Sequence, residues 1–274
     1  EEDGQYRPGG QYWDAVIWCV GAWSHYVATG DRDFLAMAYT AVTNALRYFE
    51  EWECDPADGL FCGAACYGDG VSAYPAPYAS PQEPGILAWA RENPHWGGHG
   101  LPMKVLSTNC LYARAYTLAG KMARELGDDA AQQWEEKADE MADSINRHFW
   151  DDSLGHYWYF LGPFGGCNYQ EALGQAFAIL WGIADQTKTS SILRTLYVAP
   201  AGVPAVHPCF ERYQIPNADV ASIPPKVELI EKEDRELKAV DPNFASYGRH
   251  AGTVWGHIQG FWAEAALKSG HTDL

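Results

Sequence analysis

Two stretches of the chain, Cys54-Asp-Pro-Ala-Asp-Gly-Leu-Phe61 and Trp150-Asp-Asp-Ser-Leu-Gly-His-Tyr157, repeat one another in the order of their residue types. Each follows a helical pattern and leads into a segment rich in glycine and aromatic residues, 61–77 and 157–167. Self-similarity at this scale is typical of repeated supersecondary units, whose long loops gather on one functional face. The two stretches therefore predict a fold of repeated helical hairpins with a site among the connecting loops.

Apolar residues recur at spacings of three and four over paired segments, which predicts amphipathic helices. Asp31 is expected to cap the second helix, Ser107 or Thr108 to open the third, and Gly30 and Gly127 to end the first and third. The expected helices cover 13–29, 31–52, 107–127, a partner from about 134 to 149, about 169–185, about 187–197, and 253–268. The first helix of each pair carries few charges and the second has a charged face. This asymmetry predicts a ring of inner helices buried on both sides and outer helices with one wet face.

Composition favours a neutral small-molecule substrate. A chain of 274 residues with 47% hydrophobic content can form one large domain or two small ones. We expect a single domain over 1–274, with an irregular charged insertion at about 199–247. The formal net charge of −17 argues against nucleic acid and anionic membrane partners. The 12 Trp, 16 Tyr and 10 Phe exceed what a core requires and are typical of sites that bind pyranose rings.

The cysteine count bears on compartment and metal binding. Seven scattered cysteines are an odd number, which predicts reduced thiols, and the polar first ten residues contain no secretory apolar segment. We therefore expect a cytoplasmic protein with no membrane span. Cys62 and Cys66 lack metal-ligand spacing with His95 and His99, so we expect no metal and no cofactor. Assembly into a homo-oligomer is compatible with the sequence.

One loop carries a candidate catalytic acid. In Asp58-Gly-Leu-Phe-Cys-Gly-Ala-Ala-Cys-Tyr-Gly-Asp69-Gly, a carboxylate lies inside a run of glycines and aromatic residues. Partial burial in such a loop raises a carboxyl pKa toward neutrality while substrate can still reach the group, as a catalytic acid requires. The alternative for Asp69 is capping of a turn, because Asp before Gly is common turn chemistry.

Five motifs in register resemble the six-hairpin (α/α)6 toroid glycosidases, nearest the inverting group that includes trehalase, processing α-glucosidase and mannosylglycerate hydrolase. The motifs are Gln11–Trp18, Asp58–Gly70, Leu106–Tyr112, Glu171–Phe177 and Gly252–Trp262. This resemblance spans nearly the whole chain and implies an all-α toroid of helical hairpins. The ring is expected to be incomplete, because about seven helices are predicted and a full toroid has twelve.

The same resemblance implies a glycoside hydrolase that cleaves a small oligosaccharide or glycoside with inversion, and it makes Asp69 the general acid. Around the substrate it places Trp13, Asp14, Tyr67, Trp96, Asn109, Trp255 and Gln259. The alternative for Asp14 is a carboxylate that stabilises a helix N-terminus. For Trp255 the alternative is a core residue, since large aromatic side chains are usually buried.

An inverting glycosidase needs a second carboxyl about 6.5–9.5 Å from the first. In the resembled family the general base follows the motif around Trp255, in a segment that would lie beyond residue 274. Glu171, Glu211 and Glu264 are the other candidates. Glu171 opens the third inner helix after a Gly and aromatic stretch, so we expect it to face the same mouth as Asp69. Its alternative role is stabilisation of the helix dipole.

Two other function classes remain open. A non-catalytic or degenerate carbohydrate-binding relative would keep the cleft without a complete acid and base pair. A sugar epimerase or isomerase on a similar toroid would exchange protons through histidines. The candidates for that role are His25, His156, His207, His250 and His257.

Overall fold

A computed structural model describes residues 14–66, 74, 78, 102–208, 210 and 252–271. Over these residues the elements are α1 (Asp14–Thr29), α2 (Arg32–Trp52), β1 (Cys54–Asp55), β2 (Leu60–Phe61), β3 (Lys104–Val105), α5 (Leu106–Leu126), α6 (Ala131–Phe149), β4 (Trp150–Asp151), β5 (His156–Tyr157), β6 (Phe160–Leu161), β7 (Gln170–Glu171), α7 (Ala172–Leu180), α8 (Gln186–Thr195), β8 (Val206–His207) and α10 (Gly256–Lys268). The strands form the antiparallel pairs β1–β2, β3–β6, β4–β5 and β7–β8. Helices dominate the described part of the chain, as predicted.

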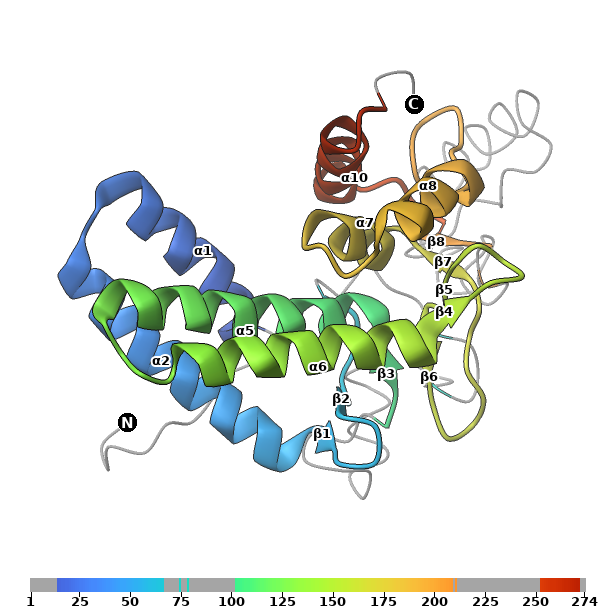
Figure 1. Cartoon of the computed structure of the whole chain (residues 1–274). Helices are drawn as coiled ribbons and strands as arrows, with labels where there is room; N and C mark the ends of the chain where they lie inside the picture. Colours follow the sequence, from blue (N-terminus) through green and yellow to red (C-terminus); the bar gives the residue numbers. More distant parts are fainter. Residues whose placement is uncertain are drawn as a thin grey trace, which may run out of the picture.

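Helix α5 lies at the centre of the arrangement. It contacts α1, α2, α6 and α7, while α10 packs against α7 (Figure 1). Figure 1 shows α6 running alongside α5, with α7, α8 and α10 grouped at one side of this pair. Strands β1 and β4 directly follow the ends of α2 and α6, and strands β3 and β7 directly precede α5 and α7. We call this side of the molecule, where the inner helices begin, the loop face.

The structure corrects the expected start of α5. This helix begins at Leu106 after the extended residue Val105, which provides no side-chain cap. The hydroxyl groups of Ser107 and Thr108 bind other segments instead, because Ser107 Oγ accepts from Cys66 N at 3.1 Å and Thr108 Oγ1 donates to Ala64 O. The expected end is confirmed, since Gly127 caps α5 with a left-handed φ of 75°.

Burial separates inner from outer helices in two of the three pairs. α5 buries most of its side chains, whereas α6 buries one stripe that includes Trp134, Met141 and Phe149. α7 and α8 show the same contrast. α1 differs from the prediction, since Trp18 is 41% exposed and Val27 is 66% exposed. One face of α1 therefore lies open, as expected for a ring that is incomplete in the described residues.

Helix boundaries in the last part of the chain also differ from the prediction. α7 is shorter than expected, because residues 170–171 form strand β7 before it and Gly182 adopts a φ of 74° after it. α8 covers Gln186–Thr195, where about 187–197 was expected. Asp185 then caps α8 by accepting from Lys188 N at 2.8 Å. α10 begins at Gly256, three residues later than predicted. The expected cap at Asp31 is confirmed, since its carboxylate accepts from Phe34 N at 2.9 Å.

The two repeated stretches fold into the same hairpin. Cys54 pairs with Phe61 in one, and Trp150 pairs with Tyr157 in the other. The turn glycines Gly59 and Gly155 have φ values of 70° and 71°, which favour glycine. The repeat read from the sequence is therefore a structural repeat.

None of the described helices combines the length and the apolar character of a membrane span. A single domain over 1–274 stays a prediction, and most of the insertion expected at 199–247 lies outside the described residues.

Candidate functional site

The inner helices α5, α7 and α10 begin in the same way. An extended residue precedes each helix, and the fourth residue of each helix carries a side-chain amide. The preceding residues are Val105, Glu171 and Trp255, and the amides belong to Asn109, Gln175 and Gln259. This common register identifies three equivalent positions on the loop face.

Each amide brackets the backbone of one residue in an earlier segment. Its oxygen accepts from the backbone N–H of that residue and its nitrogen donates to the carbonyl of the same residue. The distances are 2.8 and 3.1 Å for Asn109 with Phe61, 3.2 and 2.7 Å for Gln175 with Tyr157, and 3.0 and 2.8 Å for Gln259 with Val203. We refer to these three pairs as the amide clamps.

Antiparallel pairing explains why two of the clamps are needed. Cys62 N donates to Glu53 O, and Trp158 N donates to Phe149 O, each at 2.8 Å. Hydrogen-bonded and non-bonded pairs alternate along an antiparallel ladder, so the next residue inward turns its N–H and carbonyl away from the partner strand. In these hairpins that residue is Phe61 or Tyr157, and the amide of the following inner helix satisfies it.

The clamps bear on two expected substrate contacts. Asn109 is fully buried, and its nitrogen also donates to Val105 O at 2.8 Å. Gln259 is committed to Val203 through both amide atoms. This geometry supports a positioning role for both residues, and their contact with substrate stays a prediction. Gln175 was not among the expected site residues, although its place four residues after Glu171 matches that of Asn109 after Val105.

Glu171 lies at the meeting point of two inner helices. It precedes α7, but its carboxylate reaches α5, where Oε2 accepts from Ser107 N at 3.0 Å. The side chain therefore caps the first turn of α5. Gly174 makes room for it, because a Cβ at that position would lie 2.5 Å from Oε2.

Burial governs the ionisation of Glu171. The residue is 3% exposed, and desolvation raises the pKa of its carboxyl to about 8, although the hydrogen bonds from Ser107 act in the opposite direction. Burial therefore favours the protonated form of this carboxyl. Strongly raised carboxyl pKa values are typical of acid–base groups when the carboxyl lies in a cleft.

The segment that leads to Asp69 is attached to the same helical turn. Cys66 N donates to Ser107 Oγ, and Ser107 N donates to Glu171. Asp69 follows Cys66 by three residues, a separation that spans at most about 10 Å of extended chain. Asp69 itself lies outside the described residues, as do Trp13, Tyr67, Trp96, Glu211 and His250, and nothing is described of the Asp14 side chain.

Aromatic rings line the core beneath this turn. Tyr74 stacks on Tyr159 with centroids 5.8 Å apart, and Phe210 stacks on Tyr159 and Tyr169 at 6.5 and 5.0 Å. Tyr159 also accepts from Leu106 N at 2.9 Å through its carbonyl. These rings were not among the expected site residues, and the signal for them was the Gly and aromatic composition of the loops. Trp255 is half-buried against the core, directly before α10.

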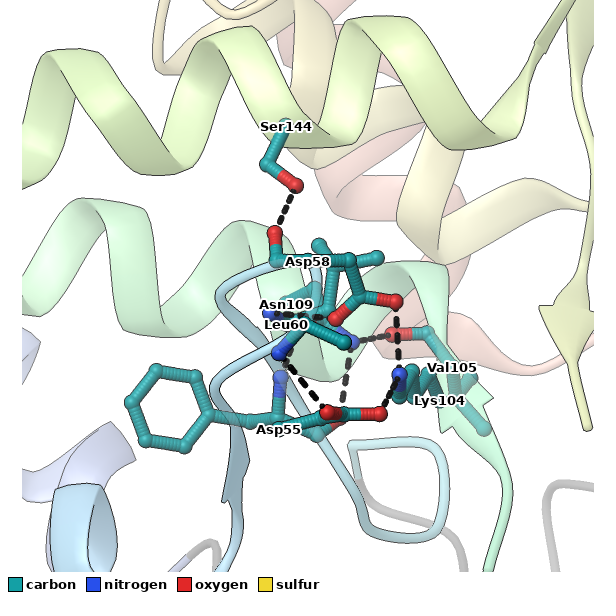
Figure 2. A network of polar contacts seen from close by, with 9 residues as sticks. Asp55, Asp58, Leu60, Lys104, Val105, Asn109 and Ser144 are labelled. Atoms are coloured by element: carbon teal, nitrogen blue, oxygen red, sulfur yellow. Dashed lines mark hydrogen bonds and ion pairs between the residues drawn. The ribbon is translucent and has the colours of Figure 1, made fainter.

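A second polar cluster ties the first hairpin to β3. Lys104 Nζ lies 2.6 Å from Asp55 Oδ2 and 2.6 Å from Asp58 Oδ2 (Figure 2). The hydrogen bond from Lys104 is the main cause that lowers the pKa of Asp55. Ser144 of α6 donates to the carbonyl of Asp58. The network therefore joins α6, the hairpin and the strand that precedes α5.

The other candidate groups are histidines, one further acidic residue and the cysteines. His25 packs on Phe34, His156 Nδ1 lies 2.9 Å from Tyr157 O, and His207 stacks on the ring of Tyr197. Glu264 is paired with Lys268 at 2.6 Å on exposed surface. The cysteines within the described ranges are free thiols. In those ranges no group of three or more His, Cys, Asp or Glu is arranged to hold a metal ion.

Solved structures share this fold. A GH63 mannosylglycerate hydrolase from Thermus thermophilus matches with a TM-score of 0.64 at 14% identity, over 99% of this chain and 71% of that one. Neutral trehalase Nth1 from Saccharomyces cerevisiae matches with a TM-score of 0.52 at 14% identity, over 94% and 62%. A GH78 rhamnosidase of Bacillus sp. GL1 matches with a TM-score of 0.52 at 19% identity, over 93% and 26%. At these identities the likeness shows the fold.

The chain thus spans less than two thirds of the length of that rhamnosidase and of the trehalase. No match to a curated protein sequence is found. A family model described as the mannosylglycerate hydrolase MGH1-like glycoside hydrolase domain matches residues 17–216, which is more than half of the chain. The fold is an (α/α) toroid of helical hairpins, and the chain belongs to the family of MGH1-like glycoside hydrolase domains.

Proposed function

We propose that this chain hydrolyses a glycosidic bond in a small oligosaccharide or glycoside, through an inverting mechanism that uses two carboxyl groups. The observation that carries the proposal is Glu171, a buried carboxyl on the loop face with a pKa of about 8. It is linked through Ser107 to the segment that leads to Asp69. Family membership supports the reaction class, and the acidic chain suits a neutral carbohydrate substrate.

In this mechanism Asp69 is the general acid and Glu171 is the second carboxyl. The acid protonates the glycosidic oxygen while the bond from that oxygen to the anomeric carbon breaks. The second carboxylate takes a proton from a water molecule, whose oxygen bonds to the anomeric carbon from the opposite face. The product therefore carries inverted configuration.

The raised pKa of Glu171 favours a second assignment of roles. A proton donor must hold its proton at the working pH, and burial gives Glu171 that property at neutral pH. In this alternative Glu171 protonates the leaving group, and ionised Asp69 activates water. Both assignments use the same two carboxyls and give the same stereochemistry.

Pocket residues follow the family resemblance. Trp13, Asp14, Tyr67, Trp96 and Trp255 are proposed to contact the sugar. Asn109 and Gln259 are proposed to hold the pocket walls through the amide clamps, because both amides are bound to backbone. Residues 1–274 are proposed to form one catalytic domain.

The test begins with a panel of neutral disaccharides and aryl glycosides of both anomeric configurations. Hydrolysis is followed by release of reducing sugar, and the anomer first formed is identified by NMR. We expect inversion and a fall in kcat of about 100-fold or more for Asp69→Asn and Glu171→Gln. Asp139→Asn, on the exposed face of α6, is the control and is expected to match wild type.

Substrates with activated leaving groups separate the two assignments, because a weakly basic leaving group departs without protonation. The variant that lacks the general acid is expected to recover activity on such substrates, while the variant that lacks the base is not. Wild-type hydrolysis by Asp69→Asn, or a product of retained configuration, would overturn the proposal. Sugar binding without hydrolysis by the wild-type chain would instead identify a degenerate binding relative.

A further inference from the structure

A hollow whose described walls do not include Glu171 lies at the loop face. It has a volume of about 530 Å³ and lies between the end of α2, the first hairpin and the β3–β6 pair. Its walls include Trp52, Glu53, Asp58, Lys104 and Pro163. The volume falls within the range of about 300–1,000 Å³ typical of small-molecule pockets. Among the described residues that form its walls, Glu171 is absent.

The charged groups of the hollow are fixed before any ligand arrives. Lys104 lies 2.6 Å from both Asp55 and Asp58, and its side chain is 13% exposed. Figure 2 shows these groups held between the hairpin and β3. Prearranged polar groups lower the entropy cost of binding, because few rotamers remain to be ordered.

Glu53 adds a carboxyl suited to hydroxyl groups. It is 6% exposed, and burial raises the pKa of its carboxyl to about 8. Burial thus favours the protonated form, and a protonated carboxyl both donates and accepts hydrogen bonds. A sugar hydroxyl likewise donates and accepts, so it can pair with this group in either direction.

The remaining features restrict the class of ligand. Trp52 is 53% exposed at the rim and offers a flat apolar ring, the surface on which pyranose rings pack. With Glu53 protonated, one positive charge on Lys104 faces two negative charges on Asp55 and Asp58. The net negative charge disfavours anionic ligands. Both carboxylates are already bound by Lys104, so neither is left without a partner for an organic cation.

We propose that this hollow is a second binding site for a neutral polyhydroxylated ligand, namely a sugar, with Trp52 as the stacking surface and Glu53, Asp58 and Lys104 as hydrogen-bonding groups. The site extends the proposed function from one carbohydrate contact region to two. It does not depend on the catalytic roles of Asp69 and Glu171.

The proposal is tested by binding of monosaccharides, which the chain cannot hydrolyse. The indole N–H signal of Trp52 is assigned by comparing wild type with Trp52→Ala and is followed by NMR during addition of D-glucose or D-mannose. We expect the signal to shift with saturation at millimolar sugar, about −4 kcal/mol of binding free energy or weaker. Calorimetry is expected to show a tenfold or greater loss of affinity at this site in Trp52→Ala.

Two controls make the result specific. Trp18→Ala removes an exposed tryptophan on α1 and is expected to leave the affinity within about twofold of wild type. Glu53→Gln keeps a neutral hydrogen-bonding group of similar shape and is expected to bind, whereas Glu53→Ala is expected to lose binding. D-glycerate, an anion, is expected to leave the Trp52 signal in place.

An unshifted Trp52 signal at saturating sugar would overturn the second site, as would an equal response to D-glycerate or a response limited to amino sugars. Loss of hydrolysis in Asp69→Asn together with an unshifted Trp52 signal would reject this site and leave the hydrolase proposal in place. A shifted Trp52 signal in a chain that hydrolyses no glycoside would support this site and reject the hydrolase proposal.

Discussion

Replacement of Asn109 by alanine tests the amide clamps most directly. The side chain has no exposed surface and makes three hydrogen bonds, with Phe61 N, Phe61 O and Val105 O. Asn109→Ala leaves the Phe61 N–H and carbonyl buried without these partners, and each such loss costs about 1–2 kcal/mol. With a further contribution from the small cavity, we expect a loss of about 3–4 kcal/mol in the free energy of unfolding.

Urea unfolding followed by far-ultraviolet circular dichroism measures this loss, and thermal unfolding should show a fall of about 10 °C in Tm. Gln132→Ala is the matched control, because this amide is exposed on α6 and bonds only to Glu136, so a change within about 0.5 kcal/mol is expected. The reasoning would be refuted by a loss below about 1 kcal/mol in Asn109→Ala together with a raised KM. That result would make Asn109 a substrate contact.

Three further predictions concern Glu171 and Lys104. Gly174→Ala places a Cβ 2.5 Å from Glu171 Oε2 and should lower the free energy of unfolding by about 1–3 kcal/mol. Gly260→Ala, with open space around it, should not destabilise α10, and an equal loss of stability in both variants would contradict the reasoning. Because the folded pKa of Glu171 is raised from 4.5 to about 8, its stabilising contribution is full below pH 4.5 and is lost as pH rises to 8. Glu171→Gln should therefore flatten the decline in stability over that window by up to about 1.4 kcal/mol per pH unit, and an unchanged slope in urea titrations would exclude a buried protonated Glu171. Lys104→Met leaves two carboxylates facing each other and should cost about 3 kcal/mol, whereas Lys268→Met, at an exposed pair, should change stability by less than about 0.5 kcal/mol in the same assay.

Local sequence patterns determined the elements that depend on nearby residues. The helical period of α2, α5 and α6 follows from apolar side chains three and four residues apart, and the cap at Asp31 needs only a carboxylate within one turn. The repeat of the two loop stretches was also readable, because the turn at Gly59 and Gly155 requires a left-handed φ that favours glycine. That these stretches are β-hairpins was seen only in the structure. The family resemblance rested on motifs of the same short range.

Local patterns failed where a distant segment supplied the partner. Ser107 and Thr108 have the composition of helix caps, yet their hydroxyls bind the segment at 64–66, and Glu171 caps the turn instead. The shorter α7 reflects strand β7, which forms because Gln170 and Glu171 pair with β8. The open face of α1 reflects which helices surround it, a property that its own periodicity does not contain.

The sequence by itself thus determined the helices and the repeat of the two loop stretches, because short-range periodicity and turn chemistry specify both. The class of glycosidase came from the resemblance of its motifs to a known family. Tertiary structure alone decided that Glu171 is buried against α5, that three amides clamp the loop face, and that Lys104 joins two aspartates beside a hollow. Burial and hydrogen-bond partners arise from segments that are tens of residues apart in the chain. A carboxyl pKa depends on both, so the chemistry of the site was set only when those segments came together.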